Sequence, residues 1–274
     1  MPIPSTHASI VTPVTARHVK RLVRSSVTSL CFHGGRLAHR RPPGPRVLLY
    51  HRVNDTESLY LSSSVADFAS QVAHLVRNGF RSVDLEAVLR GCQAPGTVAF
   101  TFDDGYLDTF ENAFPILKRF GFTATVFLVT EYIGRPSYLD VPQILEMRHA
   151  GFALGSHTNS HPHLPRLDRG SKWAQIFGSR IRLQEILGSP IDLFCYPYGE
   201  FDQDAVDIVR RSGYRGACSC VPGINARVDP FLIRRTLIGA SDTLADFARK
   251  VAGAHDPLQV AMHGVRRHIL GRSV

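Results

Sequence analysis

The chain has 274 residues, of which 44% are hydrophobic, enough to bury the core of one large domain or two small ones. It contains no apolar stretch of about 18 residues and no continuous apolar segment near its N-terminus, so we predict neither a transmembrane helix nor a secretory signal. Five cysteines occur without the spacing of a disulfide framework, which indicates thiols in a reducing compartment.

The net charge of +9 belongs mainly to the ends of the chain. Residues 1–46 contain eight Lys or Arg and no acidic residue, and three more arginines follow Asp256. We therefore predict a basic leader with a Pro-rich linker over residues 1–45, a domain over 46–257 and a basic tail over 258–274. A basic leader suits contact with an anionic membrane surface, whereas the near-neutral domain argues against nucleic acid as a partner. The missing signal favours the cytoplasm, including the inner membrane face, and leaves export open; nothing indicates the oligomeric state.

From residue 46 onward, segments typical of strands alternate with segments typical of helices. Short apolar runs predict strands over residues 46–50, 97–102, 123–130, 153–158, 191–199, 216–220 and 230–238. Apolar residues at helical spacing predict helices over residues 65–80, 107–122, 141–152, 171–188, 202–214 and 243–254, with Pro115 as a break in the second. This alternation implies an α/β fold with helices outside a parallel sheet. About seven parallel strands favour a distorted or partly closed (β/α) barrel.

Four of the predicted strands end in polar or proline-containing segments. These segments are "LLYHRV", "TFDDGY", "GSHTNSHPHL" and "FCYPYG". Because the C-terminal ends of parallel strands in a barrel face the same mouth, we expect the four segments to meet there.

The second and third of these segments contain residues that suit a metal site. His157 and His161, four residues apart, can direct two imidazoles at one point, and a carboxylate beside them would complete a ligand set. Two surface histidines are the alternative, and we interpret His163 as flanking the pair. Of the adjacent Asp103 and Asp104, one can bind the metal while the other faces the attacking water, because successive residues at a strand end point in different directions. A solvated turn is the alternative for "DDG".

Three of the segments also match a family. "TFDDGY", "HTNSH" and "YPYG" resemble the first three motifs of the polysaccharide deacetylases of carbohydrate esterase family four, the nodulation-type chitooligosaccharide deacetylases. The resemblance covers roughly residues 46 to 240 and implies a distorted (β/α) barrel. It implies a hydrolase that acts on carbon–nitrogen (non-peptide) bonds and removes N-acetyl or O-acetyl groups from a polysaccharide or oligosaccharide. The position of a histidine in the first segment is similar to a branch that acts on poly-N-acetylglucosamine and other exopolysaccharides.

The resemblance carries roles to the residues of the first two motifs. It implies that Asp103 is the general base and that a metal is held by Asp104, His157 and His161. The implied cofactor is a divalent metal, zinc in the first place, with cobalt, nickel or iron as alternatives. The implied partner is an acetylated glycan substrate.

The third motif and the ends of the domain supply the remaining implied roles. The backbone N–H of Tyr198 would hold the oxyanion, and Tyr106, Pro197 and Tyr198 would contact the substrate. The family's general acid is a histidine, for which we prefer His51 over His263 because His51 ends the first predicted strand.

One position departs from the family pattern. Cys195 stands where members commonly carry an arginine that orients the base, and Arg234 and Arg235 are the candidates to replace it. If neither does, a catalytically impaired glycan-binding module on the same fold is the alternative function. A related metal-dependent amidase is a further alternative.

Overall fold

The computed structural model describes residues 44–56, 60–254 and 256. Within that part of the chain, no helix is long and apolar enough to cross a membrane. Residues 1–43 of the predicted leader, the whole of the predicted C-terminal tail and His263 lie outside the described residues. The domain boundaries that we placed at residues 45 and 257 therefore stay predictions.

One parallel sheet forms the centre of the domain. Its path runs β10-β1-β5-β6-β7-β8-β9, every pairing along it is parallel, and β4 pairs with β5 beside the path. The strands of this sheet are β1 (Arg46–Tyr50), β4 (Arg81–Ser82), β5 (Thr97–Phe102), β6 (Ala124–Leu128), β7 (Ala153–Ser156), β8 (Leu193–Cys195), β9 (Gly216–Cys218) and β10 (Thr236–Leu237). The predicted α/β fold, with about seven parallel strands in a partly closed barrel, is confirmed.

The two ends of the sheet approach each other through one segment of the chain. Ile233 forms a parallel bridge with Cys218 of β9. Two residues later, the amide of Arg235 donates to the carbonyl of Val221. Three residues after Ile233, Thr236 of β10 pairs with β1. The same short segment thus contacts β9 on one side and β1 on the other, which curls the sheet into a barrel.

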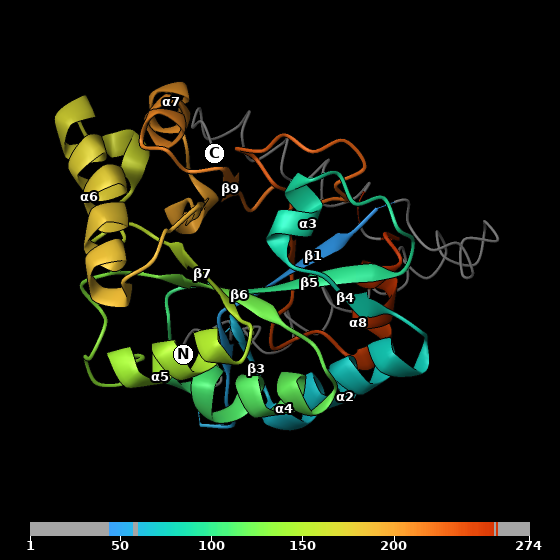
Figure 1. The fold of residues 1–274 in the computed structure, drawn as a ribbon. Helices are drawn as coiled ribbons and strands as arrows, with labels where there is room; N and C mark the ends of the chain where they lie inside the picture. Colours follow the sequence, from blue (N-terminus) through green and yellow to red (C-terminus); the bar gives the residue numbers. More distant parts are fainter. Residues whose placement is uncertain (1–43, 57–59, 255, 257–274) are drawn as a thin grey trace, which may run out of the picture. The chain divides into compact units, whose positions relative to one another are not determined.

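Helices surround this sheet, and all of them except α3 cover its outer face. They are α2 (Val65–Arg77), α3 (Leu85–Leu89), α4 (Phe114–Arg119), α5 (Val141–His149), α6 (Arg169–Leu187), α7 (Gln203–Arg211) and α8 (Leu244–Val251). Figure 1 shows α2, α4 and α5 along one side of the sheet, and α6 and α7 near β7 to β9. Side chains that cap the first turn begin α2, α5 and α7, namely Ser64, Asp140 and Asp202.

Side chains inside the barrel are distinct from those under the helices. Alternate residues of a strand face opposite sides, so Val47, Ala99 and Phe127 point inward while their neighbours pack against the helices. Helix α3 covers one end of this inner core through Leu85 and Val88. Apolar side chains therefore close the inner core at that end.

Glycine makes room for a large inner side chain. Gly155 of β7 pairs with Phe127 of β6, and a Cβ at residue 155 would lie 2.5 Å from ring carbons of Phe127. Two residues on, His157 faces the same side of its strand as Gly155. The phenylalanine ring fills the barrel next to the place where His157 emerges.

Several predicted boundaries differ from the observed ones. Strands β7 and β8 end at Ser156 and Cys195, earlier than predicted, because the loops that follow leave the extended conformation. The helix predicted over residues 107–122 begins as a π-helical turn over Thr109–Ala113 and continues as α4, which has a proline in its first turn. Short elements such as α3 and the parallel pair β2 (Arg52–Val53) and β3 (Ser62–Ser63) were not predicted, since their periodicity is too brief to detect.

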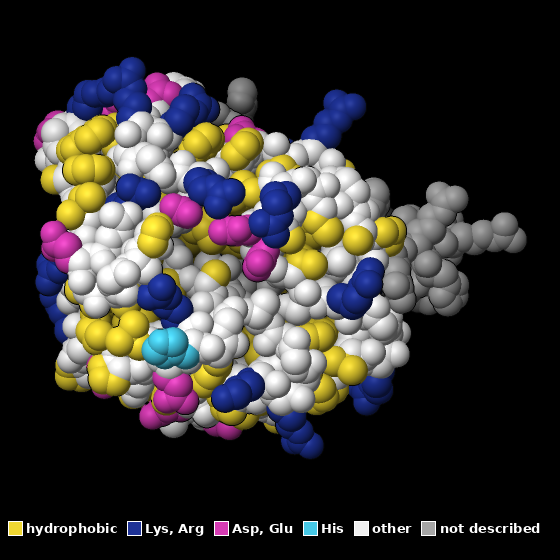
Figure 2. Space-filling model, in the orientation of Figure 1, with side chains coloured by type: hydrophobic (Ala, Val, Ile, Leu, Met, Phe, Trp, Pro, Cys, Tyr) yellow, Lys and Arg dark blue, Asp and Glu magenta, His cyan; other side chains and the backbone are white. Residues whose placement is uncertain are grey.

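Charges of both signs share the surface of this domain. Figure 2 shows Lys and Arg side chains interspersed with Asp and Glu over one face. The distribution agrees with the near-neutral charge of the segment between the basic ends of the chain.

Candidate active site

Asp103 points into the barrel because it continues the inner face of β5. Ala99, Thr101 and Asp103 are two residues apart, and the amide of Asp103 donates to the carbonyl of Tyr50, which extends the pairing with β1 by one residue. The carboxylate is 2% exposed. A carboxylate so deeply buried requires a cationic partner.

Arg235 is that partner. Its Nη1 and Nη2 donate to the two carboxylate oxygens of Asp103 at 2.7 and 2.8 Å, and its Nε donates to the carbonyl of Ser219 at 2.9 Å. Burial alone would raise the pKa of Asp103, but the charge and hydrogen bonds of Arg235 lower it well below its ordinary value. Asp103 is therefore ionised at neutral pH. Of the two candidate arginines, Arg234 is exposed and donates to the carbonyl of Pro222 instead.

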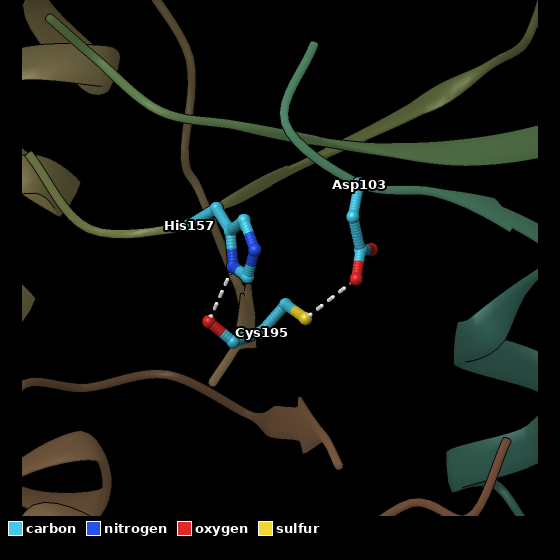
Figure 3. A group of neighbouring side chains, drawn as sticks. All are labelled: Asp103, His157 and Cys195. Carbon is cyan, nitrogen blue, oxygen red and sulfur yellow. Dashed lines mark hydrogen bonds between the residues drawn. The ribbon is translucent and has the colours of Figure 1, made fainter. Parts of the chain in front are cut away.

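Cys195 occupies the space beside this ion pair. Figure 3 shows its thiol directed at Asp103 and its carbonyl at His157; the thiol donates to Asp103 Oδ2 at 3.4 Å. Arg235 Nη2 lies 3.0 Å from the same sulfur. Burial raises the pKa of the Cys195 thiol well above its ordinary value, so the sulfur stays protonated.

Asp103, His157 and Cys195 lie close enough together to suggest a metal site, but their chemistry does not fit one. Both oxygens of Asp103 are engaged by the cation of Arg235, which would also repel a second cation next to the sulfur. A protonated thiol is moreover a poor metal ligand. This group instead surrounds the buried ion pair.

A second group fits a metal ion. Asp104 Oδ1 lies 3.5 Å from His157 Nε2 and 3.4 Å from His161 Nε2. That oxygen is buried and has no hydrogen-bond partner among the described residues, which is costly unless a cation occupies the space between the three atoms. One carboxylate and two imidazoles form a set typical of a divalent cation with open positions for water and substrate. The structure thus brings the three predicted ligands together.

The imidazoles are oriented and in the protonation state that a metal needs. His157 Nδ1 lies 2.8 Å from the carbonyl of Cys195, and donation of its proton leaves the Nε2 lone pair directed at Asp104. Burial lowers the pKa of His157 to about 3 and that of His161 to about 4, so both rings are neutral at pH 7. Burial and the charge of Asp103 raise the pKa of Asp104 to about 7.

Backbone strain is concentrated at this site. The described chain has five non-glycine residues with positive φ, and four of them, Asp104, Thr158, His161 and Tyr198, belong to the three loops of the site. Each such residue costs free energy that the surrounding structure must offset. The loops are therefore held in directions that an unstrained chain would not adopt.

The other predicted residues lie around the same centre. Tyr198 follows β8 in the short turn Pro197–Gly199, and its ring lies 4.4 Å from that of His161. The Tyr106 ring stacks on Tyr138 at 5.0 Å. His51 follows β1 directly, and its Nδ1 is buried without a hydrogen-bond partner among the described residues. Their catalytic and binding roles stay predictions.

Comparison with known proteins agrees with this geometry. Residues 90–217 match the model of the polysaccharide deacetylase family. The Bacillus subtilis protein YxkH is 26% identical over 192 residues, which cover 68% of each chain. The poly-beta-1,6-N-acetyl-D-glucosamine N-deacetylase of Escherichia coli K12 is 25% identical over 252 residues, 74% of this chain but only 38% of that protein. The solved structure of IcaB from Ammonifex degensii has a TM-score of 0.69 and 28% identity, covering 78% of this chain and 99% of that one.

The barrel and its site define a deacetylase-type hydrolase domain. Residues 90–217 carry a polysaccharide deacetylase domain, as the motifs predicted. The predicted enzyme class is thereby confirmed as well.

Metal affinity should depend on pH in the direction set by Asp104. Because the pKa of Asp104 is raised to about 7 while both histidines are already neutral, a cation must displace one proton below pH 7. We expect Zn²⁺ affinity to rise about tenfold per pH unit from about pH 5 and to level off above about pH 7. Calorimetric titration of metal-free protein measures this. The variants Asp104→Asn and His161→Ala should lose binding, and an affinity independent of pH would contradict the assignment.

Removing the partner of Asp103 should destabilise the fold. We expect Arg235→Met to lower the free energy of unfolding by about 3–5 kcal/mol, because it leaves a carboxylate buried without a cation. The neighbouring exposed Arg234 provides the control. Arg234→Met should change the free energy of unfolding by less than about 0.5 kcal/mol. Urea unfolding at pH 7 compares the two. Equal losses of stability in the two variants would show that the ion pair is not the main cause of the destabilisation.

Proposed function

We propose that this protein is a metal-dependent deacetylase that hydrolyses the acetamido group of an N-acetylated glycan and releases acetate. The observation that carries the proposal is the convergence of Asp104, His157 and His161 next to a separate, ionised carboxylate, that of Asp103. The first three residues can hold a cation, while the fourth is kept from binding it by Arg235 and is available for proton transfer. The match of residues 90–217 to the polysaccharide deacetylase family supports the same reaction.

An amide is a weak electrophile with a poor leaving group, so both sides of the bond need assistance. A divalent cation held by the three ligands supplies a Lewis acid that polarises a carbonyl and lowers the pKa of water. Asp103 accepts the proton of the attacking water at Oδ1, which accepts one hydrogen bond from Arg235 and keeps a second lone pair, whereas Oδ2 accepts from both Arg235 and Cys195. The N–H of Tyr198 donates to the oxygen on which negative charge develops.

His51 is the proposed general acid for the departing sugar nitrogen. His51 follows β1, whose pairing with β5 brings it next to the ionised Asp103, and its buried Nδ1 has no hydrogen-bond partner among the described residues. Burial lowers the pKa of His51 below its ordinary value, and the charge of Asp103 offsets only part of that shift. The carboxylate thus opposes, without cancelling, the loss of the imidazolium form that proton donation requires.

The substrate class that we propose is a polymer or oligomer of N-acetylglucosamine. The Escherichia coli relative is named for a poly-beta-1,6-linked polymer of this sugar, and its alignment covers 74% of this chain. Zinc is the first choice of metal because two imidazoles, one carboxylate and open positions suit it. Acetate release from a panel of acetylated sugars distinguishes the linkage, the chain length and an O-acetyl target.

The argument for an impaired glycan-binding module has lost its basis. It depended on the cysteine at position 195, which left the base without an arginine. Arg235 places a guanidinium on Asp103 from another part of the chain, with both carboxylate oxygens engaged. A metal-dependent amidase that acts on a different carbon–nitrogen bond would fail to release acetate.

The base should be separable from the metal site. We expect Asp103→Asn to keep one equivalent of Zn²⁺ and to lower kcat for acetate release by about 10²–10⁴-fold, because the proton acceptor is gone while the ligands remain. Acetate release from tetra-N-acetylchitotetraose, with metal content by elemental analysis, measures both. Asp67→Asn, on the exposed face of α2, is the control. Wild-type turnover in Asp103→Asn would contradict the role of Asp103 as the base. If the metal-loaded wild type released no acetate from a panel of acetylated sugars, the proposed deacetylase function would be contradicted.

The acid should be separable from the base. We expect His51→Ala to lower kcat by about 10²-fold or more without loss of metal, since it removes the donor to the leaving nitrogen. His263→Ala should leave kcat close to that of the wild type. The reverse pattern would transfer the acid role to His263.

A further inference from the structure

A histidine outside the metal group joins two loops of the site. His163 follows the metal ligand His161 by two residues, and its ring stacks on that of Tyr198 with centroids 4.1 Å apart and planes within 11°. The stacking therefore connects the loop that holds the metal to the turn that carries the proposed oxyanion donor.

The same histidine also bonds to that turn. His163 Nδ1 lies 2.8 Å from Glu200 Oε2, and the amide of Glu200 donates to the carbonyl of Pro197. Glu200 thus ends the turn in which Tyr198 sits. Tyr198, His163 and Glu200 form a closed chain of contacts, which we call the clamp.

The turn needs such support because its conformation is unfavourable. Tyr198 has φ of 59° and ψ of 4°, a left-handed conformation that a bulky residue rarely adopts. Its side chain is 53% exposed, so burial in the core does not fix it. The next residue, Gly199, approaches Cys220 so closely that a Cβ would lie 2.4 Å from the cysteine Cβ. Contacts with the loop of His161 and His163 therefore add to the backbone bonds of the turn in setting the direction of the Tyr198 N–H.

We propose that His163 and Glu200 are positioning residues that hold the Tyr198 N–H at a fixed place relative to the metal ligands. The inference rests on the proposed function, in which the cation and this N–H act on the same oxygen. Two groups that stabilise one developing charge must keep their separation, because a shift of about 1 Å in a catalytic group can cost about 10²-fold in rate. The clamp meets this requirement by joining the two loops directly through side chains.

The contacts distinguish this role from that of a metal ligand. His163 does not belong to the group of donors around Asp104, and its Nδ1 is engaged by Glu200. Its ring faces Tyr198 rather than the carboxylate. Loss of His163 should therefore disturb the turn and leave the metal in place.

Single and double variants test the clamp through turnover and metal content. We expect His163→Ala and Glu200→Ala each to lower kcat by about tenfold or more, with little change in KM and one equivalent of Zn²⁺ retained. Because they break one chain of contacts, the double variant should be no slower than the slower single variant. Glu200→Gln keeps an acceptor for His163 and should recover part of the rate. His149→Ala, an exposed histidine on α5, is the matched control.

Amide hydrogen exchange of the metal-free protein provides a readout that does not need activity. The amides of Gly199 and Glu200 are bonded within the turn, and both should exchange faster in His163→Ala and in Glu200→Ala but not in His149→Ala. Unchanged exchange would overturn the clamp, and so would a kcat within twofold of the wild type or loss of metal from His163→Ala. If the wild type releases no acetate, the proposed function fails by itself. Exchange then still decides whether the clamp holds the turn.

Discussion

The buried ion pair between Asp103 and Arg235 is the interaction on which the site depends. Removing both charges from water costs several kcal/mol per ion, and two parallel hydrogen bonds of 2.7 and 2.8 Å offset that cost. The pair separates the tasks of two adjacent carboxylates. Arg235 keeps Asp103 ionised and unavailable to a cation, while the resulting negative charge, together with burial, raises the pKa of Asp104 and favours a metal beside it. Two neighbouring aspartates thus acquire different chemistry from their surroundings.

The site is assembled from rigid strands and strained loops. Strands end early, and the residues that follow adopt positive φ at Asp104, His161 and Tyr198, so each loop turns toward the same centre. Strain of this kind persists only where other contacts maintain it. The carbonyl of Cys195 orients His157. The contacts of His163 with Tyr198 and Glu200 connect the loop after β7 to the turn after β8. Support for the reacting groups therefore comes mostly from neighbouring loops.

Cys195 shows how the chain can change one motif and keep the geometry around it. An arginine at this position would place its charge on Asp103 from β8, but here the charge comes from the segment that links β9 to β10. The smaller cysteine leaves room for that guanidinium and adds a weak hydrogen bond to the same carboxylate. The same electrostatic result is reached from a different strand.

The sequence by itself determined the class of the fold and most of the candidate metal site. Alternating apolar runs and helical spacings predicted the parallel barrel, and the positions of Asp104, His157 and His161 at strand ends predicted that they meet, because parallel strands end on one side. Only the tertiary structure decided between Arg234 and Arg235. These are adjacent residues of one type, and which of them points inward depends on how residues 230–237 pair with β9 and β1. The link from His163 to Glu200 was equally beyond the sequence, since it joins residues far apart in the chain through loop conformations that no local pattern specifies.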